Sequence, residues 1–315
     1  MSRRSVFIIM LVFLVSAIAG CGMNAKPQEK KLQVVASVYP VQEFVKAVGK
    51  DRVEVSLLVP PGTEPHDWEP TAKDLAKIKG SALLVYHGAG LEHWVGAVVK
   101  PELLGSAKAV EASKGIALLD AAESESGEEA GHSHGGEAHG AKDPHVWLDP
   151  VLAQQEVKTI LAALVEVDPA HAGEYEANAA AYLKELQQLH DEYTAALRQT
   201  AKKELITSHA AFSYLAKRYQ LQQVPVMGLS PDAEPTADKM AEIIRFCKTH
   251  QVKYIFFETL VSPKLAEVLS REAGASTLVL NPLEGLTVEE YKAGKSSYLT
   301  LMRENLQQLK KALAQ

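Results

Sequence analysis

The sequence predicts an α/β fold of two similar lobes, each with a parallel sheet, bridged by one long rigid helix. Short apolar runs alternate with helical segments, this alternation occurs twice, and a helical stretch with few Gly or Pro residues separates the two series. Alternating strands and helices favour a parallel sheet with helices on both faces. The length of 315 residues also fits two lobes, because single cores stop growing near roughly 250 to 300 residues.

The first lobe is expected at residues 32–165. Its strand candidates are rich in Val and Leu and almost continuous in apolarity, as strands covered on both faces are. They lie at residues 32–38, 53–59 and 82–86. Helical segments are expected between and after them, near residues 41–49, 71–79 and 91–99.

The second lobe, expected at residues 204–315, repeats the pattern. Strand candidates lie at 205–208, 223–227, 254–258 and 277–280, with helices beginning near Ala211, Thr236 and Ser262. Glu69-Pro70-Thr71-Ala72 in the first series recurs as Glu234-Pro235-Thr236-Ala237 in the second. Each Thr is placed to cap the next helix, which predicts that the lobes share one design.

A connecting helix is expected within residues 166–203. From Asp168 to Thr200 the apolar residues recur with helical spacing, from Tyr175 to Leu197. About thirty residues at 1.5 Å each span roughly 45 Å, enough to run along both lobes and limit hinge motion.

The N-terminus has the pattern of a secretory signal peptide at residues 1–20. Arg3 and Arg4 precede an apolar segment that ends in small residues. Ile18-Ala19-Gly20-Cys21 resembles the lipobox of bacterial lipoproteins, which predicts a lipidated Cys21 and a polar tether at 21–31. The mature chain is therefore expected outside the cytoplasm, anchored to the bacterial cell membrane by lipid. An ordinary cleaved signal is the alternative.

Composition narrows the possible partners and covalent links. The formal net charge of -6 argues against nucleic acid as a partner. After cleavage Cys247 is the one remaining thiol, so no intramolecular disulfide is expected.

Histidine is plentiful, with 11 residues. Three of them, His132, His134 and His139, lie in a Glu-rich segment at residues 123–142 that cannot form a core and is expected to be a disordered loop. Neutral imidazoles suit zinc, copper and nickel, so this loop is predicted to bind metal weakly as an auxiliary site. The alternative is a solvated loop with incidental histidines.

Three further histidines, His66, His145 and His209, occupy loops expected at one end of the two sheets. His66 and His209 follow strands, and His145 lies between the acidic segment and a helix. Ligands of open α/β sheets bind at the carboxyl ends of strands. Zinc usually takes four ligands, and the carboxylate available in the late loop is Glu284; Asn281 or a water is the alternative fourth ligand.

Two acidic residues are expected to orient these ligands from behind, Asp149 for His145 and Glu258 for one of the ligands. His87 and His93 lie in a turn between a strand and a helix and are interpreted as supporting or surface groups. The remaining three, His171, His190 and His250, lie on or beside helices and are expected to be solvated.

Several motifs together resemble the zinc-binding lipoproteins of metal ABC importers, the cluster A-I family. They are the lipobox, Glu64-Pro65-His66, Asp143-Pro144-His145-Val146-Trp147-Leu148-Asp149-Pro150, Thr207-Ser208-His209-Ala210-Ala211-Phe212 and Asn281-Pro282-Leu283-Glu284-Gly285-Leu286. The resemblance covers essentially the whole mature chain. It implies metal in the interlobe cleft with His66, His145, His209 and Glu284 as ligands.

The resemblance also implies a function. A monomeric, non-enzymatic protein would capture Zn²⁺ and hand it to an ABC importer permease driven by a cytoplasmic ATPase. Manganese-binding relatives tend to have a carboxylate at the position of His209 and to lack the His-rich loop, which favours zinc. Three alternatives remain open: a manganese-binding homologue, a surface adhesin on the same fold, and a secreted zinc hydrolase.

Overall fold

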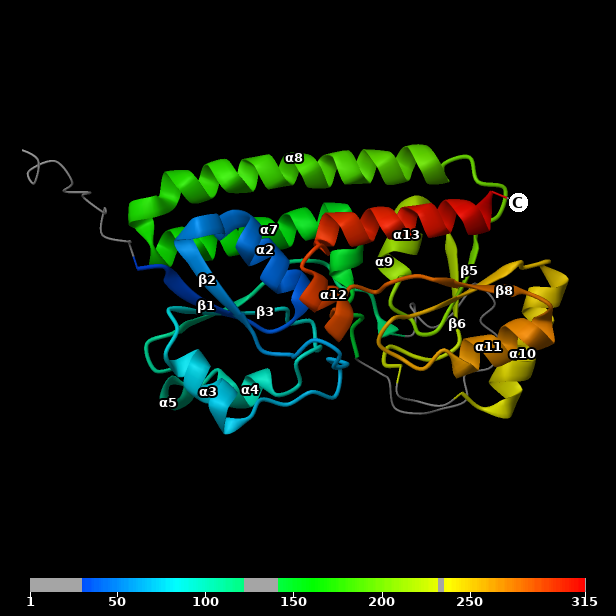
Figure 1. Ribbon diagram of the computed structural model, residues 1–315, viewed down its shortest axis with the longest axis horizontal. Helices are drawn as coiled ribbons and strands as arrows, with labels where there is room; N and C mark the ends of the chain where they lie inside the picture. The colour runs from blue at the N-terminus through cyan, green and yellow to red at the C-terminus, as the bar shows by residue number, and fades with distance from the viewer. Residues whose placement is uncertain (1–29, 122–140, 232–234, 315) are drawn as a thin grey trace, which may run out of the picture. The chain divides into compact units, whose positions relative to one another are not determined.

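Two four-stranded parallel sheets, one from each half of the chain, form the framework (Figure 1). The structure is a computed structural model that describes residues 30–121, 141–231 and 235–314. The predicted signal peptide, Cys21 and the three histidines of the acidic segment lie outside these residues. The sheets have the same topology, with strand orders β2-β1-β3-β4 and β6-β5-β7-β8.

The first sheet contains β1 (Leu32–Ala36), β2 (Val53–Leu57), β3 (Leu83–Tyr86) and β4 (Lys108–Glu111). Its helical elements are α2 (Tyr39–Gly49), η1 (Lys50–Arg52), α3 (Ala72–Lys79), α4 (Val95–Val98) and α5 (Pro101–Leu104). The three predicted strands are confirmed. The edge strand β4 was not predicted, because its sequence Lys-Ala-Val-Glu lacks a continuous apolar run and all four residues are partly exposed.

The second sheet contains β5 (Glu204–Thr207), β6 (Gln222–Pro225), β7 (Tyr254–Phe257) and β8 (Ser276–Val279), in the predicted positions. Its helices are α9 (Ser213–Tyr219), α10 (Ala237–Thr249), α11 (Lys264–Ala273), α12 (Val288–Ala293) and α13 (Tyr298–Leu313). Thr71 and Thr236 cap α3 and α10 as the repeated motif predicts, each accepting a hydrogen bond from the backbone N–H three residues on.

The connecting region is a pair of helices with a short 3-10 turn between them. After η2 (Val146–Leu148) come α7 (Pro150–Val167), η3 (Pro169–His171) and α8 (Ala172–Leu197). The 26 residues of α8 extend for about 39 Å. This helix packs against α2 and α7 from the first half and against α9 and α13 from the second (Figure 1).

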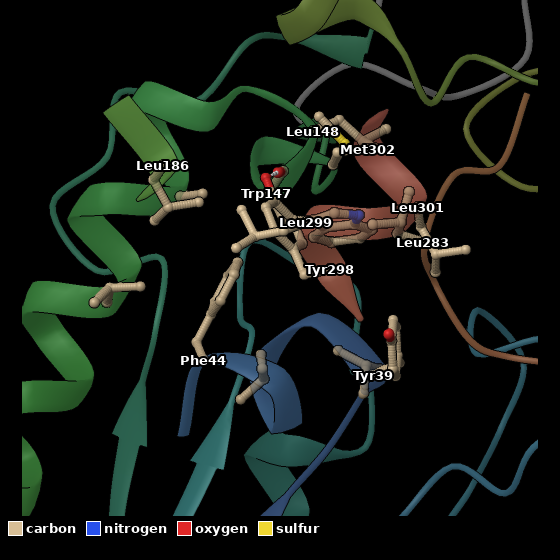
Figure 2. Close-up of a cluster of buried hydrophobic side chains, with 14 of the residues drawn as sticks. Tyr39, Phe44, Trp147, Leu148, Leu186, Leu283, Tyr298, Leu299, Leu301 and Met302 are labelled. Carbon is tan, nitrogen blue, oxygen red and sulfur yellow. Dashed lines mark hydrogen bonds between the residues drawn. The ribbon is translucent and has the colours of Figure 1, made fainter. Parts of the chain in front are cut away.

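A shared core holds the two halves together around Trp147 and Tyr298 (Figure 2). The Tyr298 ring meets Phe44 of α2 edge-on, with 4.9 Å between centroids, and its hydroxyl donates to the Trp147 carbonyl at 2.5 Å. The Trp147 indole N–H in turn donates to the Pro282 carbonyl at 2.8 Å. The indole bond joins the segment after His145 to the segment before Glu284, and the Tyr298 bond ties the first of these segments to α13.

Among the described residues, no helix has both the length and the apolarity needed to cross a membrane.

Candidate metal centre

Four side chains from four separate loops converge on one point. His66 follows β2, His145 precedes η2, His209 follows β5 and Glu284 follows β8. One potential ligand atom from each lies within 4.8 Å of all the others. The structure thus brings together the four residues that the sequence analysis proposed as metal ligands, two from each half of the chain.

The Glu284 carboxylate lies in the middle of the cluster. Its Oε1 atom is 2.9 Å from His145 Nε2, 3.1 Å from His209 Nε2 and 3.4 Å from His66 Nε2. The three imidazole centroids are 5.2 to 6.0 Å apart. All three Nε2 atoms therefore face one small volume, which is the geometry in which a single cation can contact three nitrogens and a carboxylate oxygen.

Burial separates His66 from the other members. The side chains of His145 and His209 are 0% exposed and that of Glu284 is 2% exposed, whereas His66 is 10% exposed. His66 lies in a loop held by the Gly62 N–H, which donates to the Leu286 carbonyl at 2.7 Å. Gly62 has φ +82°, a backbone conformation that favours glycine, so this residue lets the His66 loop reach the Glu284 loop.

A carboxylate lies behind each of the two fully buried imidazoles. Asp143 Oδ1 accepts from both the backbone N–H and Nδ1 of His145, at 2.9 and 2.8 Å. Glu258 accepts from His209 Nδ1, at 2.7 Å to each oxygen, and from the His209 backbone N–H at 3.2 Å. These bonds fix the ring orientation and leave each Nε2 facing the cluster.

The prediction that Asp149 orients His145 is wrong. Asp149 instead caps α7 by accepting from the Val151 N–H at 2.9 Å, and it pairs with Arg218 at 2.7 Å. It precedes Pro150, the first residue of α7, so its carboxylate satisfies a free helix N–H. Asp143 holds His145 instead, and its place two residues before the histidine was the sequence signal. Glu258, expected to orient one of the ligands, lies behind His209.

Asn281, the alternative fourth ligand, makes local bonds instead. Its side-chain oxygen accepts from the Leu283 N–H, and its backbone N–H donates to the Asn305 side chain, each at 2.8 Å. Leu283 adopts φ +58°, and the resulting turn places Glu284, rather than Asn281, in the cluster.

Electrostatics couple the buried members of the cluster. Burial lowers the pKa of the His145 imidazole, but hydrogen bonds to Asp143 and Glu284 outweigh burial and raise the pKa above its usual value. Burial likewise opposes protonation of His209, yet the charges of Glu258 and Glu284 raise its pKa well above the usual value. Burial would raise the pKa of Glu284, but the three histidines, His209 foremost, hold it well below the usual range.

The other histidines in the described parts of the chain lie outside this cluster. His93 is about half exposed and faces Glu69, and His250 is 40% exposed. His171 contacts Asp168 and His190 contacts the Tyr219 hydroxyl, both from partly buried positions rather than fully solvated ones. His87 is fully buried beside Glu156, a pairing that the sequence analysis did not find.

The chain was compared with known protein families. Residues 34–312 match the family described as "Zinc-uptake complex component A periplasmic", ZnuA. This chain belongs to the ZnuA family. The match spans both sheets, the connecting helix and all four members of the cluster, which confirms the family resemblance inferred from the motifs.

Individual relatives agree with the family assignment. The "High-affinity zinc uptake system protein ZnuA" of Bacillus subtilis is 46% identical over 312 residues, covering 98% of this chain and 96% of that protein. The "Zinc-binding lipoprotein AdcA" of Streptococcus pneumoniae is 44% identical over 93% of this chain, which spans 58% of the longer AdcA sequence.

The fold has solved counterparts. The Zn(II)-bound ZnuA-like domain of S. pneumoniae AdcA matches with a TM-score of 0.75 and 42% sequence identity, covering 91% of this chain and 100% of that domain. The predicted fold of two parallel-sheet lobes and a long helix is confirmed.

Proposed function

We propose that this protein captures Zn²⁺ outside the cytoplasm and delivers it to an ABC importer. The observation that carries this proposal is the buried cluster of His66, His145, His209 and Glu284, whose potential ligand atoms lie within 4.8 Å of one another. Membership of a zinc-uptake family and the zinc-binding names of the relatives support it. Zn²⁺ is the transported ligand, held by the four cluster side chains.

The donor set favours zinc over manganese. Three imidazole nitrogens and one carboxylate oxygen suit borderline-soft Zn²⁺, whereas manganese favours oxygen donors. The two buried imidazoles are additionally fixed by Asp143 and Glu258. Orienting carboxylates of this kind raise the basicity of zinc-ligating histidines.

The same donor set supports a binding role rather than a catalytic one. A hydrolytic zinc site keeps a position open for water beside three protein ligands. Four protein ligands complete a tetrahedral sphere, and Glu284 belongs to that sphere and is not free to act as a base. We therefore propose a non-enzymatic carrier, and we take it to be monomeric, as the family resemblance implies.

The proposed location and partners follow from the sequence and the family. We take residues 1–20 as a signal peptide, Cys21 as the lipidated residue and 21–31 as the tether to the cell membrane. The partner is an importer permease with its cytoplasmic ATPase. We take residues 32–165 and 204–315 as the two lobes, joined through 166–203, and retain the weak auxiliary role of the acidic segment as a sequence prediction.

Metal content and competition titration test the proposal. The mature protein and a variant lacking residues 123–142 should each bind one Zn²⁺ tightly, and His209→Ala should weaken that binding by orders of magnitude in both. Loss of tight binding on deletion would place the site in the acidic segment. At pH 7.5, tighter binding of Mn²⁺ than of Zn²⁺ would overturn the choice of metal.

A further inference from the structure

His87 and Glu156 form a fully buried pair that is separate from the metal cluster. His87 Nδ1 lies 2.9 Å from Glu156 Oε1, and both side chains are 0% exposed. His87 follows the last residue of β3, and Glu156 lies in the middle of α7. The His87 backbone is fixed by Glu92, whose carboxylate accepts from the N–H groups of His87 and Gly88 at 2.8 and 2.9 Å.

The other edge of the His87 ring touches the segment that carries His145. His87 Nε2 donates to the Pro144 carbonyl at 2.6 Å. Its ring also meets Trp147 edge-on, with centroids 4.7 Å apart and an interplanar angle of 87°. His87 therefore contacts the residue immediately before His145 and the residue two positions after it.

The chemistry of these contacts fixes where a proton must be. A carbonyl oxygen accepts hydrogen bonds only, so His87 Nε2 carries a proton. The opposite ring nitrogen, Nδ1, lies within ion-pair distance of Glu156 Oε1, but the two groups are not aligned as a hydrogen bond. His87 therefore presents a fixed donor to Pro144 from Nε2, with the Glu156 carboxyl group behind the ring.

A contribution to the stability of the fold does not by itself explain why this buried pair is present. Burying a carboxylate in an apolar helix face is costly, and replacing buried ion pairs by apolar side chains is often neutral or stabilising. The neighbouring α7 residues Ala153, Val157 and Ile160 are fully buried and apolar. A Leu at position 156 would continue that face.

We propose that His87 and Glu156 are positioning residues that hold the Pro144–Trp147 segment and thereby the His145 ligand. Asp143 holds the ring and the backbone N–H of His145, and the His87 pair holds the residues on either side of it, Pro144 and Trp147. Through the Trp147 indole, which donates to the Pro282 carbonyl at 2.8 Å, the same pair supports the loop that leads to Glu284. This inference rests on the proposed zinc-binding function.

The double variant His87→Leu/Glu156→Leu tests the proposal, because it removes both partners and leaves no unpaired buried charge. We expect it to fold with a Tm at or above that of the wild type and to bind Zn²⁺ about tenfold or more weakly, as for loss of other groups that support metal ligands. With Co²⁺ as the probe, its visible absorption bands should shift relative to the wild type.

Ile243→Ala is the matched control. Ile243 is buried in the separate core of α10, so this variant should lose thermal stability and keep wild-type zinc affinity and cobalt bands. Wild-type affinity and bands in the double variant would overturn the proposal. The proposal would also be overturned if the double variant failed to fold, or if Ile243→Ala lost as much zinc affinity as the double variant. Either result would assign the pair a merely structural role. Absence of tight zinc binding in the wild type would instead refute the proposed function.

Discussion

Lowering the pH should weaken zinc binding, and the apparent Kd should depend steeply on pH. His145 has a carboxylate oxygen within hydrogen-bond distance of each ring nitrogen, from Asp143 at Nδ1 and from Glu284 at Nε2. His209 likewise faces Glu258 at Nδ1 and Glu284 at Nε2. These carboxylates favour the doubly protonated imidazole, and zinc can bind an Nε2 atom only after that nitrogen has lost its proton.

The number of protons that zinc displaces sets how steeply the apparent Kd depends on pH. The pKa values of His145 and His209 are raised, so protons begin to compete with zinc at a pH above the ordinary histidine pKa of about 6.5. Below both raised values, the apparent Kd should increase by at least about 100-fold per pH unit, because at least two protons, those of His145 and His209, compete with one Zn²⁺. Glu284, whose pKa is well below its usual value, stays ionised over this range and adds no slope.

Competition titrations with a chelator of known pH dependence, from pH 5 to 8, would measure this slope. Calorimetry in buffers of different ionisation enthalpy should independently show release of at least about two protons per zinc at the acidic end. A slope of one or less throughout, or no proton release, would refute the doubly protonated cluster. Ile243→Ala, distant from the cluster, should reproduce the wild-type slope.

Further predictions concern the same cluster. Replacing His66, His145 or His209 with Ala should weaken zinc binding by more than the loss of an orienting group does, which costs roughly 10- to 100-fold in affinity. Competition titration would measure this loss. Glu284→Ala should cost less, because a water can take its place. Glu258→Gln should weaken zinc binding about tenfold at pH 7.5. It should also move the pH at which acid begins to weaken zinc binding to a lower value, because the charge that raises the pKa of His209 is lost. An unchanged pH dependence would contradict this cause. The Tm of chelator-treated protein should fall as the pH rises through the raised histidine pKa values, because their protonated forms stabilise the metal-free fold; a flat or rising Tm from pH 6 to 9 would contradict it.

The sequence could predict features that depend on local patterns. The apolar strands and the Thr71 and Thr236 caps are encoded by neighbouring residues, and His66 and His209 lie in loops that come after strands. The edge strand β4 has no continuous apolar run, and its position depends on pairing with β3. Asp149 was misassigned because its helix-capping bond and its partner Arg218, 69 residues away, are set by the three-dimensional arrangement. The His87–Glu156 pair escaped prediction for the same reason.

The buried carboxylates bear on how protons and zinc exchange in this cluster. Asp143, Glu258 and Glu284 lie within hydrogen-bond distance of the imidazoles of His145 and His209. Zn²⁺ carries two positive charges, the same charge as the two protons that we expect it to replace on these rings. The exchange therefore leaves the total charge of this buried volume unchanged. Uncompensated buried charge is costly, and this exchange creates none. Zinc loading should therefore require little rearrangement of the two sheets.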